Sequence, residues 1–546
     1  MTSLMTALIT PLMGATLLST AWAQTAAPTA PIVPAAPVAA TFTVLEFAVE
    51  GNTVMPALTI EKVLAPYLGP GKTIGDMEAA RIALEKTYQD AGFLTVFVDL
   101  PEQSTASGVI RLSVLEGRVE RLSVKGSRYF SQGYIRQRVP ELAEGTVPNF
   151  LVVQKQLADI NRTDDRRVQP ILRQGRELGG VEADLKVNDE LPVHGSIDLN
   201  NNHGQYTKPW RVMTSLRYEN AFQLDHTINF MAITAPQNPQ TSKAFLLDYI
   251  VPMAGGDAWR VTTMYSNSDV DALGAATILG KGQTVGVKRV WALPGITGLA
   301  HSFTAGWDFK NFKERTLAGS NELYTPIRYA PFNLSYDGQF NQESGAVNTL
   351  TTTMVFNWRQ LFQHDHDCGF GKADQFACKR NGADGGFAYF KVDGRRLQPV
   401  GAWLLDGRLS AQVASQALLA AEQFALTGAE AVRGYLVAEV VGDHGVFGSL
   451  ELHTPNLITP EPPATKDWYL FNEARLFGFV DAARAWTMNP TAGQQPRQSV
   501  ASVGLGAEFK TVRHSRLTVT WANPLKSTLA TPNQHPHLHM ALSLDF

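Results

Sequence analysis

Strong charge and long apolar runs are both missing from this sequence. The 546 residues carry a formal net charge of only −3, and no run of basic residues occurs among them. Nucleic-acid-binding domains normally carry a basic patch or stripe, so we exclude that class and expect no nucleic-acid partner. No apolar run of 18 or more residues follows the N-terminal segment. This excludes an ordinary helical membrane protein but not a membrane β-barrel, whose strands alternate polar and apolar residues.

Catalytic constellations and cysteines are also scarce. No Ser/His/Asp, Cys/His, phosphate-loop or paired-carboxylate pattern stands out, so we expect neither an enzyme nor a cofactor. Cys368 and Cys378 are the only cysteines, and an even count in an exported protein favours one small disulfide-closed loop. Metal-ligating residue types occur in 364–368 and at His535, His537 and His539. Because such residues in solvated segments are more often simply solvated, no metal site is predicted.

The N-terminal segment predicts export. Residues 1–23 are apolar and end in Ala21-Trp22-Ala23, a small-x-small cleavage pattern typical of a signal peptide. Residues 24–41 are rich in proline and alanine and carry no charge, which indicates an extended linker. This linker is too short and too proline-rich for a helix of its own, and none is predicted there.

Two copies of one α+β pattern are predicted after the linker, in 42–117 and 118–190. Each copy reads as strand, helix, helix, strand, strand. In the second helix of the first copy, 76–91, the apolar spacing predicts Ile82, Leu84 and Tyr88 on the inward face. Repeats of this kind imply modular binding, since each offers a sheet edge to which a partner strand can add. The alternative is a structural spacer.

From residue 191 to residue 546, helical periodicity gives way to short alternating segments separated by Asn, Gly, Pro and Asp. The last segment is the clearest, because every second residue from Leu538 to Phe546 is apolar. We count 16 such strands, an even number that suits a closed antiparallel transmembrane barrel. They lie near 193–201, 210–218, 226–233, 244–251, 258–266, 282–292, 301–309, 328–336, 349–357, 387–394, 402–411, 446–454, 469–481, 499–510, 516–522 and 539–546.

A single arginine lies in a polar, glycine-containing stretch, Val432-Arg433-Gly434-Tyr435, between two of these strands. Some 48 residues later, period-two alternation sets Phe477, Phe479, Asp481 and Ala483 on one strand face. If that face points into a barrel, a loop folded into the lumen brings Arg433 to Asp481 as a charge-assisted pair. The alternative is a surface arginine and a solvated aspartate.

These motifs resemble those of a known family. Val432-Arg433-Gly434-Tyr435 is similar to the VRGY signature of the sixth extracellular loop in two-partner secretion transporters, the TpsB or haemolysin secretion/activation family. Phe479-Val-Asp481-Ala-Ala483 resembles that family's F-x-D-x-G strand motif, with Ala483 where glycine is usual. The repeats resemble POTRA domains at Leu100-Pro101-Glu102-Gln103 and Leu115-Glu116-Gly117, and Phe546 resembles a signal read by the barrel-assembly machinery.

The resemblance implies two α+β POTRA domains followed by a 16-stranded antiparallel transmembrane β-barrel in the outer membrane, with the POTRA domains in the periplasm. It also places the cysteine segment and the Arg433 loop on the extracellular side. The expected function is recognition and secretion of an unfolded exoprotein with its own N-terminal secretion domain. Expected partners are that exoprotein, the barrel-assembly machinery and outer-membrane lipid. The alternatives are an outer-membrane protein insertase, a passive solute channel, and a surface receptor.

Overall fold

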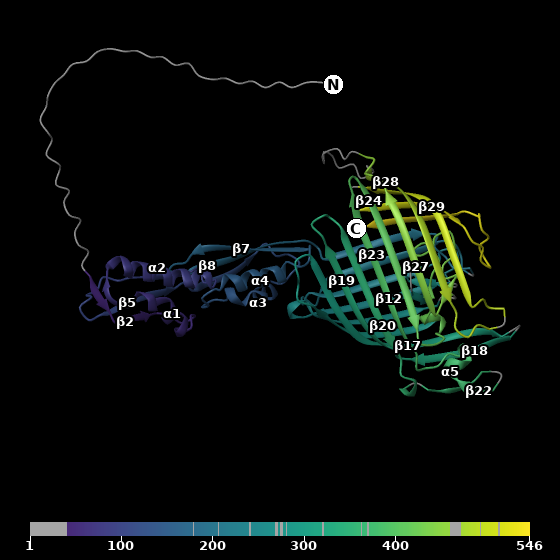
Figure 1. Ribbon diagram of the computed structural model, residues 1–546, viewed down its shortest axis with the longest axis horizontal. Helices are drawn as coiled ribbons and strands as arrows, with labels where there is room; N and C mark the ends of the chain where they lie inside the picture. Colours follow the sequence, from purple (N-terminus) through teal and green to yellow (C-terminus); the bar gives the residue numbers. More distant parts are fainter. Residues whose placement is uncertain are drawn as a thin grey trace, which may run out of the picture. The chain divides into compact units, whose positions relative to one another are not determined.

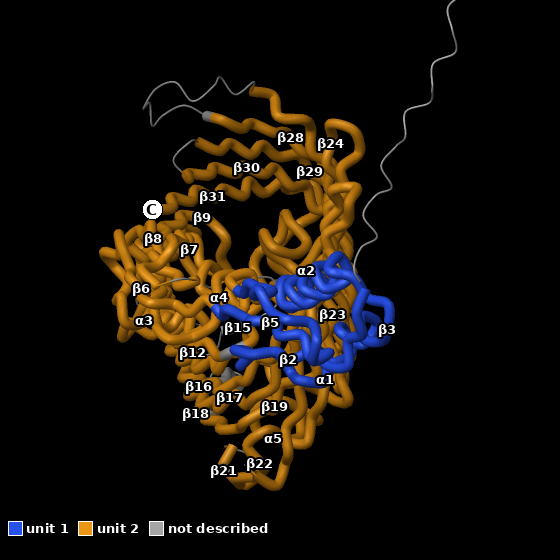
Figure 2. The backbone as a smooth tube through the Cα atoms, turned by 90° about the vertical axis from the view of Figure 1, so that its left-hand side faces the viewer, with its two compact units in different colours: residues 1–91, 96–116 blue, residues 92–95, 117–546 orange. Residues whose placement is uncertain are grey.

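The computed structural model of the protein divides into two compact units, shown as ribbons in Figure 1 and coloured separately in Figure 2. Unit 1 comprises Met1–Ala91 and Val96–Glu116, and unit 2 comprises Gly92–Thr95 and Gly117–Phe546. The predicted signal peptide, 1–23, and all of the predicted linker 24–41 except its last residue lie outside the described residues. The structure describes residues 41–177, 179–205, 207–239, 242–267, 271–273, 277–279, 281–318, 321–361, 363–368, 371–458, 471–491, 493–511 and 514–546.

Unit 1 is a small three-stranded sheet packed against two helices. Its strand order is β2-β5-β4, in which β2 runs parallel to β5 and β4 runs antiparallel to it. A separate antiparallel pair joins β1 to β3. The elements of this unit are β1 Phe42–Val44, β2 Glu46–Glu50, α1 Ala57–Leu64, η1 Ala65–Tyr67, β3 Gly69–Lys72, α2 Ile74–Asp90, β4 Val96–Asp99 and β5 Val109–Glu116.

Helix α2 begins with a capping box, in which the Thr73 side chain accepts from the Asp76 N–H and the Asp76 carboxylate accepts from the Thr73 N–H. Leu84 and Tyr88 are buried, as the sequence predicted. The prediction for Ile82 was wrong, because this side chain is 51% exposed. Its two-residue offset from the buried Ala80 rotates it by about 200° around the helix, to the opposite side from the core.

The second α+β repeat has the same topology as the first. Its strand order is β6-β8-β7, again with one parallel pair, β6 with β8, and one antiparallel pair, β7 with β8. One continuous cluster of buried side chains from both helices and all three strands forms its core. The elements are β6 Val119–Lys125, α3 Gln132–Arg138, η2 Pro140–Leu142, α4 Phe150–Ile160, β7 Arg166–Gln174 and β8 Val181–Asp189.

Both repeats use the same device to turn the chain after the first strand of the sheet. Gly51 and Gly126 have positive φ angles of 91° and 88°, and a Cβ at either would lie 2.2 Å or 2.4 Å from a carbonyl oxygen of the neighbouring strand. A carboxylate at the end of that neighbouring strand then accepts from the loop backbone. Glu116 accepts from the N–H of Val54 in the first repeat, and Asp189 accepts from the N–H groups of three successive loop residues in the second.

The larger part of unit 2 is a closed antiparallel barrel, β9 through β31. Seventeen strand elements of the described chain form its wall. Strands β18 and β19 are separated only at Ala330 and Pro331, and both pair with β17. They are therefore two halves of one wall strand, and the barrel has 16 wall strands. The wall elements are β9 Val193–Asn200, β10 Arg211–Ala221, β11 His226–Thr234, β12 Lys243–Pro252, β13 Ala258–Ser266, β16 Gly282–Ala292, β17 Leu299–Ala318, β18 Asn321–Tyr329, β19 Phe332–Asn341, β20 Val347–Phe356, β23 Ala388–Val400, β24 Trp403–Ala414, β27 His444–His453, β28 Phe471–Trp486, β29 Arg497–Thr511, β30 Ser515–Pro524 and β31 His537–Asp545.

Each of the 16 predicted strands corresponds to one wall strand, but two wall strands are much longer than predicted. Strand β17 continues to Ala318 and pairs there with β18. The sequence analysis also missed short elements between the wall strands. These are η3 Ala254–Gly256, β14 Asp271–Leu273, β15 Thr277–Leu279, η4 Arg359–Leu361, β21 Asp365–Asp367, β22 Lys372–Asp374, α5 Gln375–Lys379, η5 Ala420–Glu422, β25 Phe424–Ala425 and β26 Val441–Gly442.

The outer surface of the wall is apolar. Large side chains that alternate with buried or polar neighbours remain exposed along the strands, as with Leu450 and Leu452 on β27 and Leu505 on β29. A transmembrane β-barrel has an apolar band on its outer face, toward the lipid, and polar residues on its inner face. Among the described residues, no helix is long and apolar enough to cross a membrane.

A closed barrel of this kind resists detergent until it is heated. We expect unheated protein in dodecyl sulfate to migrate differently from boiled protein in a gel, because the hydrogen-bonded wall remains folded. Identical migration, together with recovery in the soluble fraction, would contradict the barrel.

Candidate functional site

The candidate site is the segment between β24 and β27, residues 415–443, which we call the lumen loop. Strands β25 and β26 pair at its base, and most of its side chains are buried although it connects two wall strands. Near its tip the backbone folds back on itself, because the Val432 N–H donates to the Leu426 carbonyl and the Gly428 N–H donates to the Val432 carbonyl. The loop therefore lies inside the barrel.

The wall beside the loop tip presents a polar inner face. Ser449 and Glu451 on β27 and Asp481 on β28 are buried. Their immediate sequence neighbours Leu450 and Val480 are 53% and 56% exposed on the outer face. This is the period-two pattern that the sequence predicted for Asp481.

Arg433 meets this inner face from the loop tip. Its Nε and Nη2 lie 2.8 Å and 2.7 Å from the two carboxylate oxygens of Asp481, and its backbone N–H donates to the same carboxylate at 3.2 Å. Its Nη1 lies 2.9 Å from the Glu451 carboxylate, and Nη2 donates to Ser449. The guanidinium also lies 3.5 Å from the centre of the Phe479 ring. Two carboxylates and an aromatic face thus compensate one buried cation.

The residues around Arg433 fit the loop tip against further strands. Gly434 has a φ of 89° and donates its N–H to His539 Nε2 at 3.0 Å. The Tyr435 hydroxyl lies 3.0 Å and 2.8 Å from the carbonyl oxygens of Ala501 and Lys526. Val432 is completely buried in an apolar cluster with wall residues. All four residues of the predicted motif therefore contact the wall or the core beneath it.

The start of the lumen loop pairs with a different part of the wall. Glu422 is buried, and its Oε1 lies 2.5 Å from Lys310 Nζ and 2.6 Å from the Tyr329 hydroxyl. Its other oxygen accepts from the Tyr389 hydroxyl at 3.1 Å. These partners come from β17, β18 and β23, so the loop spans the lumen between two groups of strands.

The end of the lumen loop pairs with the cysteine segment. Asp443 is completely buried and forms a bidentate pair with Arg380, with both N–O distances 2.6 Å. The same carboxylate accepts from the backbone N–H groups of Leu418 and Met488 at 2.9 Å and 2.7 Å. Arg380 directly follows α5, which contains Cys378, and the structure has a disulfide between Cys368 and Cys378.

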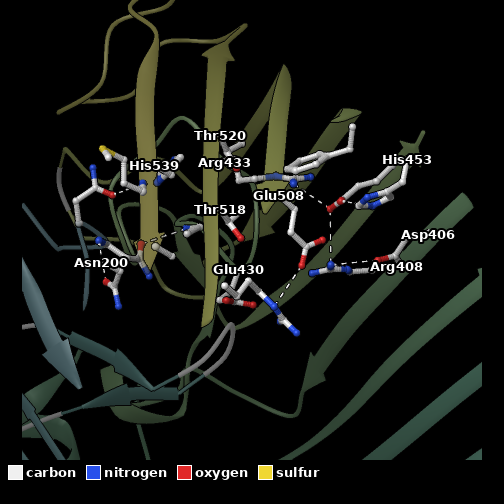
Figure 3. Close-up of a pocket in the computed structure, with 18 of the residues that line it drawn as sticks. Asn200, Asp406, Arg408, Glu430, Arg433, His453, Glu508, Thr518, Thr520 and His539 are labelled. Carbon is white, nitrogen blue, oxygen red and sulfur yellow. Dashed lines mark hydrogen bonds and ion pairs between the residues drawn. The ribbon is translucent and has the colours of Figure 1, made fainter. Parts of the chain in front are cut away.

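A polar cavity of about 380 Å³ lies beside the loop tip. Figure 3 shows Arg433 between His539 and His453 in this view, with Asp406 and Arg408 below His453. Arg408 pairs with Asp406 at 3.2 Å, so the cations of the wall are matched by carboxylates here too. The lumen beside the loop tip is therefore lined by charged and polar groups and is not an apolar ligand pocket.

Phe546, predicted as an assembly signal, lies at the pair of strands that closes the barrel. It exchanges two backbone hydrogen bonds with Gly195, at 2.8 Å and 2.9 Å, next to the five registered pairs between β31 and β9. A Cβ at Gly195 would lie 2.4 Å from the tip of the Phe546 ring, so a larger residue there would require the ring to move.

The sequence identified Arg433 and Asp481 but missed Glu451, Glu422, Asp443 and Arg380. For Glu451 a signal was present, because Ser449 and Glu451 alternate with leucines in a predicted strand. Glu422 and Asp443 lie 11 and 10 residues on either side of Arg433, in a stretch otherwise poor in charge. Their partners are distant in sequence, and no local pattern indicates them.

Two family models match the chain. Residues 42–117 match the model described as "POTRA domain, ShlB-type", and residues 348–509 match "Haemolysin secretion/activation protein ShlB/FhaC/HecB". The outer membrane transporter CdiB of Escherichia coli is 26% identical over 183 residues, which are 34% of this chain and 31% of that relative. The chain thus spans less than a third of that relative's length in the sequence match.

Solved structures of low identity share the fold over nearly the whole chain. The alignment with CdiB from Escherichia coli covers 95% of this chain and 93% of the CdiB chain, with a TM-score of 0.59 and 18% identity. BamA from Haemophilus ducreyi lacking POTRA domains 1–3 covers 92% and 100%, with a TM-score of 0.53 and 14% identity.

Fold and site together define a POTRA-containing outer-membrane β-barrel protein. Within that class, residues 42–117 match the POTRA type and residues 348–509 match the model of the haemolysin secretion/activation family, which confirms the resemblance stated from the motifs. In this family and fold the barrel lies in the outer membrane and the POTRA region lies in the periplasm.

The buried pair at the loop tip is testable by conductance. Removing one partner of a buried ion pair typically costs about 3 to 5 kcal/mol, so Arg433→Ala and Asp481→Ala should each shift the loop toward released states by about 100-fold or more. We expect longer open times in planar bilayers for both. The double variant should be little worse than either single one, because they share one interaction. Arg433→Lys should restore little, since lysine lacks the planar fork.

Arg516→Ala is the matched control. Arg516 lines the same cavity, but its ion pair with Glu508 lies within wall strands, at 3.2 Å. The conductance of the Arg516→Ala variant should stay at the wild-type level. Additive effects of Arg433→Ala and Asp481→Ala would show that the two residues act separately.

Proposed function

We propose that this protein is the pore of a two-partner secretion system. Its α+β repeats recognise an unfolded exoprotein in the periplasm, and the barrel passes that chain to the cell surface or medium. The observation that carries the proposal is the lumen loop, because a loop that spans the lumen and pairs with the wall through buried charges closes a wide pore reversibly. A passive solute channel has no need of such a device or of soluble repeats.

The charge pairs explain how the loop can be stable and still release. Arg433, Glu422 and Asp443 each meet oppositely charged partners, so these three buried charges are paired while the loop is seated. The lumen is lined by polar and charged groups, and an emerging polypeptide can replace these ion pairs by its own polar groups. Release therefore requires a competitor in the lumen rather than unfolding of the wall.

The second repeat acts as a second POTRA domain in this proposal. It shares the strand order and the glycine-carboxylate loop of the matched first domain. Strand β7 is an edge of its sheet, and Ile171 and Leu172 on that edge are exposed. A client segment can add there as a further strand, with the backbone supplying affinity and alternate side chains supplying selectivity.

Export by this route needs no enzymatic activity. The client's folding outside the cell supplies the free energy that moves it, since the sequence has no nucleotide-binding motif. The apolar outer face of the wall takes outer-membrane lipid as its solvent. Phe546 at the closing strand is the residue that we assign to recognition by the barrel-assembly machinery.

Arg433→Ala should reduce client release without preventing membrane insertion, because the proposed cycle needs a loop that seats on the wall and is displaced by the emerging chain, and this loop loses its seat. The readout is the amount of client in the medium, divided by the amount of heat-modifiable transporter in the outer membrane. The client to test is a large exported protein encoded next to this gene. Wild-type release by Arg433→Ala would remove the loop from the mechanism.

Deleting residues 42–117 should abolish client release while the barrel still inserts, because the deletion removes the first recognition domain and leaves the wall intact. The same normalised secretion measurement applies. Undiminished release would mean that the first repeat is a spacer. If the deletion instead stops other barrel proteins from assembling, the protein is an insertase.

A further inference from the structure

A second cluster of titratable side chains lies away from the lumen loop, at the end of the wall where the second repeat leads into β9. Asp165 precedes β7, His194 lies on β9 and Glu219 lies on β10. One ligand atom from each lies within 4.8 Å of those of the other two, and His194 Nε2 lies 2.7 Å from Asp165 Oδ1. Three elements, one from the repeat and two from the barrel, therefore converge here.

The cluster contains a buried carboxylate oxygen with no donor. Asp165 is only 4% exposed, and its Oδ2 is buried without a hydrogen-bond donor. The Glu219 carboxylate lies within 4.8 Å of the Asp165 carboxylate. Arg217 pairs with Glu219 at 2.9 Å, and only His194 faces Asp165 among the described ion pairs. A cation at the cluster would stabilise the buried, unpaired oxygen of Asp165.

The cluster at Asp406, Glu451 and His453 provides the contrast. It has the same three residue types within the same distance. There, however, Arg408 and Arg433 pair with the carboxylates directly, so the protein itself supplies the positive charge. At the other cluster Arg217 pairs with Glu219, but no arginine or lysine pairs with Asp165 among the described residues.

We propose that Asp165, His194 and Glu219 bind one divalent transition-metal cation. Imidazole nitrogen with carboxylate oxygen suits Zn²⁺ and its neighbours, whereas Mg²⁺ and Ca²⁺ prefer oxygen ligands alone. The ligand atoms around one tetrahedral Zn²⁺ lie roughly 3.3 Å apart, which small side-chain rotations achieve here. His194 is partly exposed, so water fills the remaining position.

Such an ion would join the second repeat to the first two strands of the wall. The neighbouring contacts already hold these elements together. Arg166, next to Asp165, is 1% exposed and binds Asp225 of the β10–β11 turn at 2.9 Å and 3.0 Å. The Tyr134 hydroxyl donates to the same carboxylate. The metal would therefore stabilise a joint that the fold has already formed, and its ligands are positioned in advance.

The test is Zn²⁺ binding by the full-length protein in detergent, without a polyhistidine tag and after EDTA treatment. Titration against a chromophoric Zn²⁺ indicator should give one equivalent bound by wild type. His194→Ala and Glu219→Gln should each bind at least about tenfold more weakly. His301→Ala removes a histidine of the wall outside the cluster and should bind as wild type does. Excess Mg²⁺ should not displace the ion.

Each variant is first checked for heat-modifiable migration, so that a loss of binding is read only from folded barrels. Glu219→Gln keeps the size of the side chain and serves if His194→Ala fails to fold. Equal Zn²⁺ binding by wild type and by both variants would overturn the proposal, as would no binding by wild type. Weaker binding by the two variants with an unchanged His301→Ala would support it.

Discussion

The ion pair between Arg433 and Asp481 is the contact on which the arrangement of the lumen depends. A guanidinium cannot be deprotonated at any relevant pH, so a loop that carries one into a barrel must find acceptors there. The wall supplies them at Asp481, Glu451 and Ser449, all on the inner face. The strand alternation that gives the barrel an apolar exterior is also what places these acceptors inside.

Much of the fold was predictable because the membrane and the sheet impose periodic patterns. The 16 wall strands and the inward orientation of Asp481 follow from the alternation of polar and apolar residues, and the two repeats follow from the apolar spacing of their helices. The sequence did not predict the extensions of β17 and β18, because polar residues interrupt the apolar alternation there. Ile82 was misplaced because the buried face of α2 includes the small Ala80, which gives a weak apolar signal.

The rest of the site was not predictable because its partners are distant. Glu422 finds Lys310 across 112 residues, and Arg380 finds Asp443 across 63. Nothing in the local sequence of Arg380 distinguishes it from a solvated surface arginine. Only closure of the wall brings such pairs together, and a single sequence contains no record of that geometry. Residue type predicted the chemistry, and topology determined the partners.

The disulfide has a consequence for the order of biogenesis. Arg380 lies two residues beyond Cys378 and one residue beyond α5, so the bridge to Cys368 holds the helix that presents the guanidinium to Asp443. Thiols oxidise in the periplasm, before a chain reaches the outer membrane. The cell's thiol-oxidising enzymes therefore prepare, upstream of insertion, the surface against which the base of the lumen loop later comes to rest.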